Sequence, residues 1–368
     1  MLYIKNVRFQ QFKNYEHAQI NLCEQVNCFV GKNGAGKTNV LDAIYYLSFT
    51  KSFFNTLDYQ NIKHGKEYFS LQANYVKNNL EEQALLVYLK GKKTLKINNN
   101  DVKKFAEHIG DYPLVMIAPN DLLLLHEGSA ERRKFMDGII AQTDKLYLND
   151  LLAYNRILEQ RNKQLKLFAE NNYLDDTLLD TYNKQLTDYG SKVHQKRLAF
   201  LQQFVPVFIK YYETISASQE QVSIAYESDL TENDLSTLLN RSLSSDIAAQ
   251  RTNKGIHKDE LDFKINNFAI KKFGSQGQQK SFIIALKLAQ YEYLKQHNSI
   301  KPLLLLDDIF EKLDQQRLNT LLQMIAQDEF GQIFITDTHL NRLKEVFEGM
   351  PAVAVNYYSV EQGNISKI

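Results

Sequence analysis

The first forty residues alternate between apolar segments and polar turns. Residues 2–9 and 17–22 are predicted strands on either side of a bend at residues 12–15. Residues 26–30 form a third apolar run that leads directly into a glycine-rich segment. After Thr38, apolar residues recur at intervals of three and four, which predicts a helix. The predicted order is therefore strand, glycine-rich loop, helix.

The next segment reads as a small sheet. Residues 67–76, 83–90 and 93–98 are predicted strands, separated by turns rich in Asn, Gly and Lys. Short turns between consecutive strands favour antiparallel pairing. We expect these strands to form an antiparallel β lobe beside the glycine-rich loop.

The middle of the chain changes to a helical period. Between residues 144 and 212, apolar side chains keep a spacing of three and four, and the polar segment 171–176 interrupts them once. This pattern predicts a helical hairpin that forms a protruding arm.

The pattern of strands and helices returns after the arm. We expect strands at 221–226 and 260–266 around a helix at 231–245. Residues 273–368 then read as a second α/β block with apolar strands at 302–306, 333–335 and 353–358. The two α/β ends of the chain are predicted to close into one head.

Composition constrains function only weakly. The chain has 368 residues, of which 44% are hydrophobic and 24% charged, so it can bury a substantial core. Its net charge of +1 points to no anionic partner, and any nucleic-acid surface must come from local basic patches. No stretch approaches the ~20 apolar residues of a membrane span, and we expect a cytoplasmic protein. Cys23 and Cys28 are expected to be buried free thiols, because no Cys/His cluster accompanies them.

Residues 31–38 match the P-loop, or Walker A, pattern G-x-x-x-x-G-K-[ST], in the strand-to-helix context that its mechanism requires. Glycines let the backbone approach phosphates, Lys37 is predicted to reach the β- and γ-phosphates of ATP, and Thr38 to bind Mg²⁺. An incidental Gly/Asn-rich turn is the alternative. The predicted nucleotide-binding residues here are Gly31, Lys32, Asn33, Gly34, Ala35, Gly36, Lys37 and Thr38.

Asp307 and Asp308 follow the fully apolar run 303–306, an arrangement that resembles a Walker B strand. We expect Asp307 to hold Mg²⁺ and Asp308 to orient or deprotonate the attacking water. Because Asp reaches less far than Glu, we expect slow ATP hydrolysis. The alternative is a solvated pair of acids at a strand end.

A third motif, a signature-like segment at residues 273–280, opens the helix before that strand. In residues 273–280, Ser275 can cap the helix and Gly277 permits close approach, so a serine hydroxyl and free amides form a second anion site. An N-capped surface helix is the alternative. The predicted nucleotide contacts are Ser275, Gln276, Gly277 and Gln278.

Two further segments follow the expected order of such an ATPase. Residues 311–314 are placed like a D-loop and residues 333–339 like the switch segment. His339 is predicted either to sense the γ-phosphate, completing a catalytic set with Asp307 and Asp308, or to cap a helix. No glutamine is identified for a Q-loop.

Walker A near the amino terminus and signature plus Walker B near the carboxyl terminus give the chain a resemblance to the SMC-like branch of ABC ATPases. Within that branch it resembles the RecF family over nearly its whole length. Lys13, the segment 255–261 and Lys280 depart from the family pattern, with Lys at positions 13 and 280 where Arg is usual. The resemblance rests on segments 36–47, 51–53, 118–122, 128–137, 154–165 and 275–280.

The resemblance implies an α/β fold with an ABC-type ATPase head, an antiparallel β lobe and a protruding helical-hairpin arm. The head would comprise residues 1–140 and 250–368, and the arm 141–249. It also implies a nucleotide contact by Lys13 and a homodimer that forms on ATP. The implied role is in DNA repair and replication, with binding of single- or double-stranded DNA at gaps and loading of RecA together with RecR- and RecO-like proteins.

Two basic clusters are the candidate DNA contacts. Phosphate binding by lysine and arginine is independent of sequence, and such runs suit it. Charge runs are also common on merely solvated faces, which is the alternative. The residues are Lys90, Lys92, Lys93 and Lys96 in the first cluster and Arg251, Lys254 and Lys258 in the second.

Three rival functions share the ATPase motifs. The nucleotide-binding domain of an ABC transporter does not normally carry a helical arm between Walker A and signature. A longer SMC-like tether would need a coiled coil for which the arm has too few residues, and an ATP-regulated nuclease would need a further acidic domain after Walker B.

Overall fold

The computed structural model describes residues 1–171, 173–216, 220–309, 329–350 and 352–368, with Leu318, Thr320, Leu321, Gln323 and Met324. The segment placed like a D-loop, 311–314, lies outside the described residues. Two compact units make up the chain and are considered separately. The first unit comprises Met1–Asp121, Thr214–Ala217 and Lys280–Ile368, and the second comprises Leu122–Glu213 and Ser218–Gln279.

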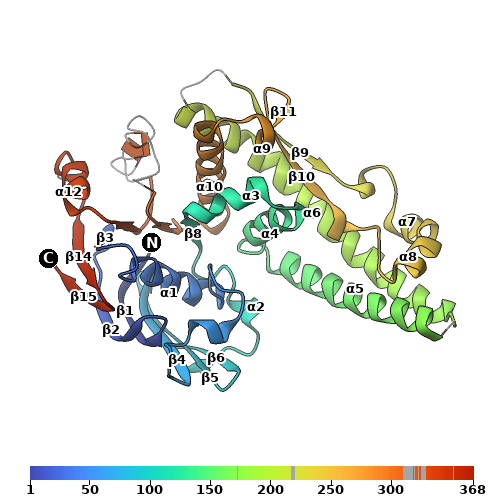
Figure 1. Cartoon of the computed structure of the whole chain (residues 1–368), viewed down its shortest axis with the longest axis horizontal. Helices are drawn as coiled ribbons and strands as arrows, with labels where there is room; N and C mark the ends of the chain where they lie inside the picture. The colour runs from blue at the N-terminus through green and yellow to red at the C-terminus, as the bar shows by residue number, and fades with distance from the viewer. Residues whose placement is uncertain are drawn as a thin grey trace. The chain divides into compact units, whose positions relative to one another are not determined.

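The first unit contains the antiparallel lobe that the sequence predicts. Its sheet has the order β2-β1-β4-β5-β6-β7 (Figure 1). Two-residue turns of Asn78–Asn79 and Asn98–Asn99 join successive strands, and all four asparagines have positive φ, as tight hairpin turns require. The strands are β1 (Leu2–Phe12), β2 (Tyr15–Asn21), β4 (Tyr68–Lys77), β5 (Leu80–Leu89), β6 (Lys92–Ile97) and β7 (Asn100–Asp101).

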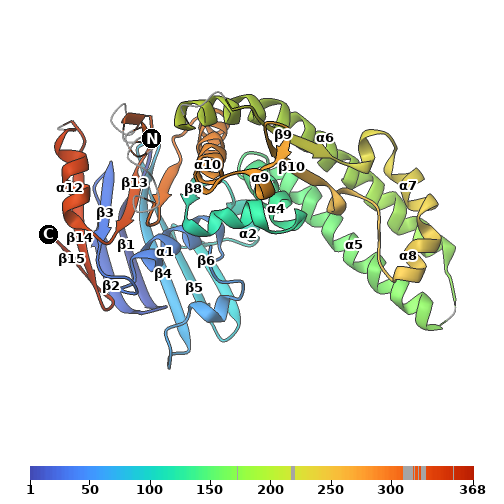
Figure 2. The ribbon, with the colours of Figure 1, turned by 45° about the horizontal axis from the view of Figure 1, so that its top comes forward.

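A second sheet of the first unit combines both ends of the chain, in the order β15-β14-β3-β13-β12-β8 (Figure 2). β3 (Val26–Val30) pairs in parallel with both β13 (Ile333–Asp337) and β14 (Val355–Glu361). The prediction that the two α/β ends close into one head is thereby confirmed. Its remaining strands are β8 (Leu114–Ile117), β12 (Leu303–Leu306) and β15 (Asn364–Lys367).

Helix α1 (Lys37–Phe49) packs against both sheets of the first unit. Ile44 and Leu47 of this helix share one buried cluster with Phe69 of the lobe and Phe334 of the mixed sheet. The glycine-rich loop that precedes α1 is therefore anchored by a helix with almost no solvated face.

The second unit is built on two long helices, α5 (Lys145–Asn171) and α6 (Asp176–Ser216), which run side by side in Figures 1 and 2. Leu165, Phe168 and Leu179 pack between them near the turn. The predicted helical hairpin and its break are confirmed. The helix expected at 231–245 is instead two, α7 (Leu235–Arg241) and α8 (Leu243–Ala249). A three-stranded sheet completes the unit, with β9 (Val222–Glu227), β10 (Glu260–Ile265) and β11 (Phe268–Ala269).

The compact units divide the chain after residues 121 and 279, whereas the head and arm were expected to divide after 140 and 249. The reason is a set of ion pairs inside the second unit. Arg132 of α4 (Ser129–Ile140) pairs with Glu260 of β10, and the buried Arg197 of α6 bridges Asp137 and Asp259. These contacts join residues 122–140 and 250–279 to the arm helices. The head and arm as independent domains stay a prediction.

Short helices and one longer helix connect these parts. α10 (Gln276–Asn298) begins at the end of the second unit and continues as a buried helix of the first unit. The others are α2 (Phe105–His108), α3 (Leu123–His126), α9 (Ile270–Phe273) and α12 (Leu340–Glu348). Among the described residues, no helix combines the length and apolar character that crossing a membrane requires.

Candidate functional site

The glycine-rich loop has a backbone that only glycine can supply. Gly34 and Gly36 have φ of 78° and 115°. A Cβ on Gly36 would also lie 2.3 Å from Asn14 Nδ2 and 2.9 Å from Tyr15 Oη. Both the conformation and the close approach therefore exclude larger residues at position 36.

The bend between β1 and β2 holds this loop in place. Asn14 Nδ2 donates to the Ala35 carbonyl at 3.0 Å, and the Tyr15 hydroxyl donates to the Gly36 carbonyl at 2.9 Å. Asn39 Nδ2 of α1 donates to Asn14 Oδ1 at 2.7 Å. The sequence predicts only a bend at Asn14 and Tyr15, and the polar Asn-Tyr pair in that bend is the signal that points to the loop.

Lys37 is the first residue of α1 and is only 4% exposed. Its ammonium donates to the carbonyls of Gly31 at 2.9 Å and Lys32 at 3.3 Å, so it lies within the curve of the loop. The helix amino terminus adds a partial positive charge at the same place. The loop and its lysine thus form a site suited to an anion.

Thr38 and Asp307, the two predicted metal ligands, are in direct contact. Thr38 Oγ1 donates to the carboxylate of Asp307, at 2.9 Å from Oδ1 and 3.1 Å from Oδ2. Thr336 Oγ1 donates to Asp307 Oδ1 at 2.8 Å. Burial raises the pKa of the Asp307 carboxyl, while the hydrogen bonds from Thr336 and Thr38 act in the opposite direction.

The order of the parallel strands explains why Thr38, Asp307 and Thr336 are in contact. β13 lies between β3, which precedes the loop, and β12, which ends before Asp307. In the parallel register, Ile335 stands opposite Leu306 and Thr336 opposite Phe29. The carboxyl ends of three neighbouring parallel strands therefore deliver Thr38, Asp307 and Thr336 to one edge of the sheet.

Asp308 is held in an unusual conformation. Its φ is 46°, and its amide donates to Thr336 Oγ1 at 2.9 Å. Its Oδ1 is buried and has no hydrogen-bond partner among the described residues. An orphaned carboxylate oxygen beside a positively charged loop is what a site for a hydrated cation would contain.

The donor set fits Mg²⁺ bound together with a phosphate group. Thr38 and Asp307 supply hard oxygen donors, and Mg²⁺ in such sites takes one or two protein ligands and completes its shell with water and phosphate oxygens. In the part of the chain that the structure describes, no group of three or more His, Cys, Asp or Glu side chains could hold a metal by itself.

His339 lies at the amino terminus of α12 and is exposed. Its amide donates to Asp337 Oδ1 at 2.7 Å, and no hydrogen bond of its imidazole is found among the described residues. The side chain is thus free to contact a ligand, and its role as the switch residue stays a prediction.

Lys13 lies beside the site, but its ammonium is committed elsewhere. Nζ pairs with the buried Asp42 of α1 at 2.5 Å and lies over the rings of Phe12 and Phe54. The structure therefore gives Lys13 a part in anchoring α1, while its neighbours Asn14 and Tyr15 contact the loop. The predicted nucleotide contact of Lys13 would require breaking this pair.

Residues 273–279 of the signature segment belong to the second unit. Ser275 Oγ accepts from the Gln278 amide at 3.2 Å, and Gln278 Oε1 accepts from the Ser275 amide at 2.6 Å, a reciprocal cap at the start of α10. Ser275 and Gln276 are exposed. Because the Ser275 oxygen acts as an acceptor in this cap, its proton remains available to an incoming anion.

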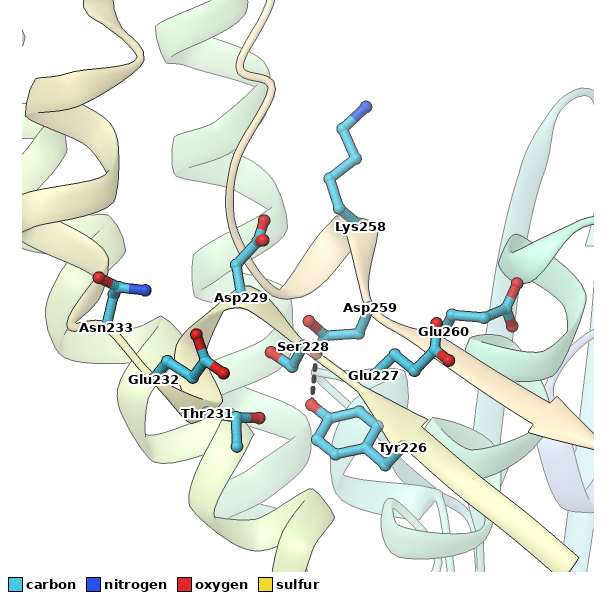
Figure 3. A pocket seen from close by; sticks show the side chains of 10 residues that line it. All are labelled: Tyr226, Glu227, Ser228, Asp229, Thr231, Glu232, Asn233, Lys258, Asp259 and Glu260. Atoms are coloured by element: carbon cyan, nitrogen blue, oxygen red, sulfur yellow. Dashed lines mark hydrogen bonds between the residues drawn. The ribbon is translucent and has the colours of Figure 1, made fainter.

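A pocket of about 440 Å³ lies elsewhere in the second unit (Figure 3). A single lysine, Lys258, lines it against five acids: Glu227, Asp229, Glu232, Asp259 and Glu260. The Tyr226 hydroxyl donates to Asp259, as the dashed line marks. Lys254, Arg197 and Arg132 pair with three of these acids, Asp229, Asp259 and Glu260, so the lining has only a small surplus of negative charge.

The two basic clusters differ in how far their charges are compensated. Lys93 donates to the Thr50 carbonyl at 2.6 Å and pairs with Asp58 at 2.8 Å, so it is structural. Lys96 pairs with Asp101 at 3.7 Å. Lys90 and Lys92 are exposed and have no ion pair among the described residues.

The second cluster is more strongly neutralised. Lys254 pairs with Asp229 at 3.0 Å, and Lys258 stands at the acidic pocket. Arg251 is exposed. Of the predicted DNA contacts, Lys90, Lys92 and Arg251 therefore remain the best suited to phosphate.

Known proteins resemble the chain over its full length. Residues 3–365 match the family described as the RecF/RecN/SMC N terminal domain. The chain is 48% identical to the DNA replication and repair protein RecF of Flavobacterium johnsoniae, over 94% of the chain and 96% of that protein. It is 42% identical to the RecF of Azobacteroides pseudotrichonymphae, over 99% of each.

Solved structures agree with this relationship. The recombination mediator protein RecF of the RecFOR pathway, in its ATP complex, superposes with a TM-score of 0.90 at 29% identity, covering 100% of this chain and 98% of that one. The Smc head domain of Pyrococcus furiosus gives a TM-score of 0.59 at 15% identity, covering 100% and 96%, and supports the fold alone. The confirmed fold class is an ABC-type ATPase head with an antiparallel lobe and a helical arm, and the chain belongs to the RecF/RecN/SMC family.

Proposed function

We propose that the chain is an ATP-dependent DNA-binding protein of recombinational repair and replication, with a slow ATPase activity that controls its dimerisation. The observation that carries the proposal is the contact of Thr38 with Asp307 beneath a preformed glycine loop. It brings together, from positions 269 residues apart, the two groups that a Mg²⁺-nucleotide site needs. The RecF relatives and the RecF-ATP complex support the same activity.

Each residue of the site has a separate task. The loop amides and Lys37 would bind the phosphates, and Thr38 and Asp307 would hold the metal. Asp308 would orient or deprotonate water, because its free oxygen faces no protein partner among the described residues. Bound ATP with Mg²⁺ supplies an activated phosphoryl group and neutralises charge during its transfer.

Ser275 would complete the site of a second copy of the chain. A capped helix end with an available hydroxyl proton suits a γ-phosphate, and its exposure leaves it accessible to a partner. Two ATP molecules would then lie in a two-fold symmetric dimer, with each site built from two chains. ATP would favour the dimer and hydrolysis would release it.

DNA binding follows from the uncompensated lysines. Lys90 and Lys92 offer phosphate contacts without base readout, which suits single- or double-stranded DNA at gaps. The named RecFOR pathway of the relative supports joint action with RecR- and RecO-like proteins in RecA loading.

Mixing two inactive variants tests the composite site. Lys37→Ala removes the phosphate-binding cation, and Ser275→Arg blocks the signature. If sites are shared between chains, a mixed dimer retains one site made of unmutated parts, whereas each variant alone retains none. We expect partial recovery of ATPase activity on mixing.

Three controls make the mixing result decisive. Each variant alone must be inactive, cross-linking must show that mixed dimers form, and the double variant Lys37→Ala/Ser275→Arg must give no recovery when mixed with Ser275→Arg. Absence of recovery in a population of proven mixed dimers would mean either that the two sites must act together or that the signature serves its own chain, and the dimer model would have to be revised.

A further inference from the structure

Thr336 has a bonding pattern that neither Walker motif accounts for. It is fully buried, at 0% exposure, at the end of β13. Its hydroxyl contacts both acids of the Walker B segment, donating to Asp307 Oδ1 at 2.8 Å and accepting from the Asp308 amide at 2.9 Å. One oxygen atom on a neighbouring strand thus joins the side chain of the first acid to the backbone of the second.

The two bonds fix the orientation of the Thr336 hydroxyl. A hydroxyl has a single proton, and a carboxylate only accepts, so that proton must point to Asp307. An amide only donates, so a lone pair of the same oxygen must face Asp308. Neither bond can reverse, and the hydroxyl has little freedom to turn toward another partner.

Each bond has a separate consequence for the site. Asp307 accepts from two hydroxyls, those of Thr38 and Thr336. If Thr38 turns to a metal, Thr336 is the hydroxyl that still orients the carboxylate. The bond to the Asp308 amide holds that residue at a φ of 46°, a conformation that non-glycine residues rarely adopt.

We propose that Thr336 is the positioning residue of this site, and that its hydroxyl aligns Asp307 for metal binding and keeps Asp308 in its left-handed conformation. The inference rests on the proposed nucleotide site. It predicts that Thr336 acts through Asp307 on the metal-dependent part of nucleotide binding. A residue with a merely structural role would affect nucleotide binding equally with and without metal.

Equilibrium titration with ATP in Mg²⁺ and in EDTA measures nucleotide binding with the metal and without it. Thr336→Val keeps the shape of the side chain and removes the hydroxyl, whereas Thr336→Ser keeps the hydroxyl. We expect Thr336→Val to weaken ATP affinity in Mg²⁺ by roughly 10-fold or more, as for partners of metal ligands in general. The ATP affinity of Thr336→Val in EDTA should change by less than about 2-fold. Thr336→Ser should retain the ATP affinity of the unsubstituted chain in Mg²⁺.

A double-mutant cycle with Asp307→Asn tests whether the effect passes through Asp307. If it does, Thr336→Val added to Asp307→Asn should weaken binding in Mg²⁺ by less than about 2-fold. Full additivity, an equal loss in EDTA, or an unchanged affinity of Thr336→Val would each overturn the proposal.

Two measurements distinguish failure of this proposal from misfolding of the variant and from failure of the proposed function. Thermal unfolding without nucleotide reports whether Thr336→Val folds, and Thr336→Ala serves in its place if it does not. The unsubstituted chain is titrated first. If it binds ATP no better in Mg²⁺ than in EDTA, the proposed function fails, and the positioning role of Thr336 fails with it. If it does bind better, the variants decide on Thr336 alone.

Discussion

The glycine loop of the first unit and the signature segment of the second unit are both predicted to bind phosphate, but they differ in how completely they are built. Lys37 and Asp307 are each only 4% exposed, and Thr336 is fully buried. Ser275 and Gln276 are exposed and rely on a local cap. The loop site is buried among contacts from distant strands, whereas the exposed signature combines its local cap with side-chain bonds of Gln278 to Glu220 and of Gln279 to His126.

This difference indicates which of the two phosphate-binding segments is already formed in a single chain. Lys37 and Asp307 are already held beside the loop by hydrogen bonds in a single chain, so we expect the loop site to bind on its own. An exposed helix end gains its binding energy only when a partner covers it. The predictions below test that contrast.

Lys37→Ala should have the largest effect. Removing the ammonium deletes charge-assisted hydrogen bonds to phosphate, a loss of roughly 3 kcal/mol or more, which is about 100-fold in affinity. Equilibrium titration of the single chain with ATP measures this. Lys103→Ala, at an exposed position of the same unit outside the predicted nucleotide site, is the control. An unchanged affinity of Lys37→Ala would remove the loop from the site.

Asp308→Asn should separate binding from hydrolysis. The carboxylate is expected to act on water, so its loss should lower the hydrolysis rate by roughly 100-fold or more while ATP still binds. The ATP-bound dimer should then accumulate, which analytical ultracentrifugation detects. If ATP binding is lost in a folded variant, the assignment of the two acids must be exchanged.

The interior of the second unit contains His257, which tests whether buried hydrogen bonds stabilise this unit as they do the loop site. Its ring contacts the Tyr154 hydroxyl at 2.8 Å and the Thr252 carbonyl at 3.0 Å. Burial lowers the pKa of His257 to about 4; the hydrogen bond to the Thr252 carbonyl opposes this, as Asp246 does more weakly, while the positive charges of Lys258 and Arg133 add to it. A neutral ring in the folded state follows.

The sign of the pH dependence is fixed by that lowered pKa. An unfolded His takes up its proton near pH 6.5, so stability is fully present above that pH and is lost as the pH falls toward 4. We expect a loss of about 2 kcal/mol in this range. Denaturant unfolding at pH 7 and pH 4.5 measures it, with His257→Gln as the variant that should lack this part of the dependence. Equal pH dependence of both proteins would contradict the assignment.

Tyr15→Phe should weaken the loop site moderately. It removes only the hydroxyl that donates to the Gly36 carbonyl at 2.9 Å. Loss of one such bond is worth roughly 1 kcal/mol, so ATP affinity should fall about 5-fold. Tyr3→Phe, on the same sheet, is the control. A change in affinity as large as that of Lys37→Ala would mean that the bend also contacts the nucleotide.

Lys90→Ala with Lys92→Ala should have the smallest effect per residue. Each lost phosphate contact should lower the slope of log affinity against log salt by about 1, with little dependence on DNA sequence. Fluorescence anisotropy at several salt concentrations measures both. Lys254→Ala with Lys258→Ala is the matched pair, and a larger effect of that pair would place the DNA surface on the second unit.

Local patterns were enough to predict much of the molecule. The P-loop depends on glycines and a lysine within eight neighbouring positions, 31–38. The arm helices α5 and α6 depend on apolar spacing within each helix. The strand β8 was not predicted, because four apolar residues, 114–117, carry no period that distinguishes strand from helix.

What only the tertiary structure decided is which distant residues meet. The bend at Asn14 and Tyr15 reaches the loop, and Lys13 and Lys93, whose ligand contacts stay predictions, pair with Asp42 and Asp58. The physical reason is that these contacts depend on the pairing of strands far apart in sequence.

Thr336 illustrates the same limit most clearly. By sequence, the segment of β13 pointed to His339, a residue type known for switching, and gave no reason to select a threonine three positions earlier. The strand order places β13 between β3 and β12, and only this order brings a β13 hydroxyl to the Walker B acids. The sequence by itself determined the chemical groups of the site, whereas the order of the parallel strands decided which of them hold one another.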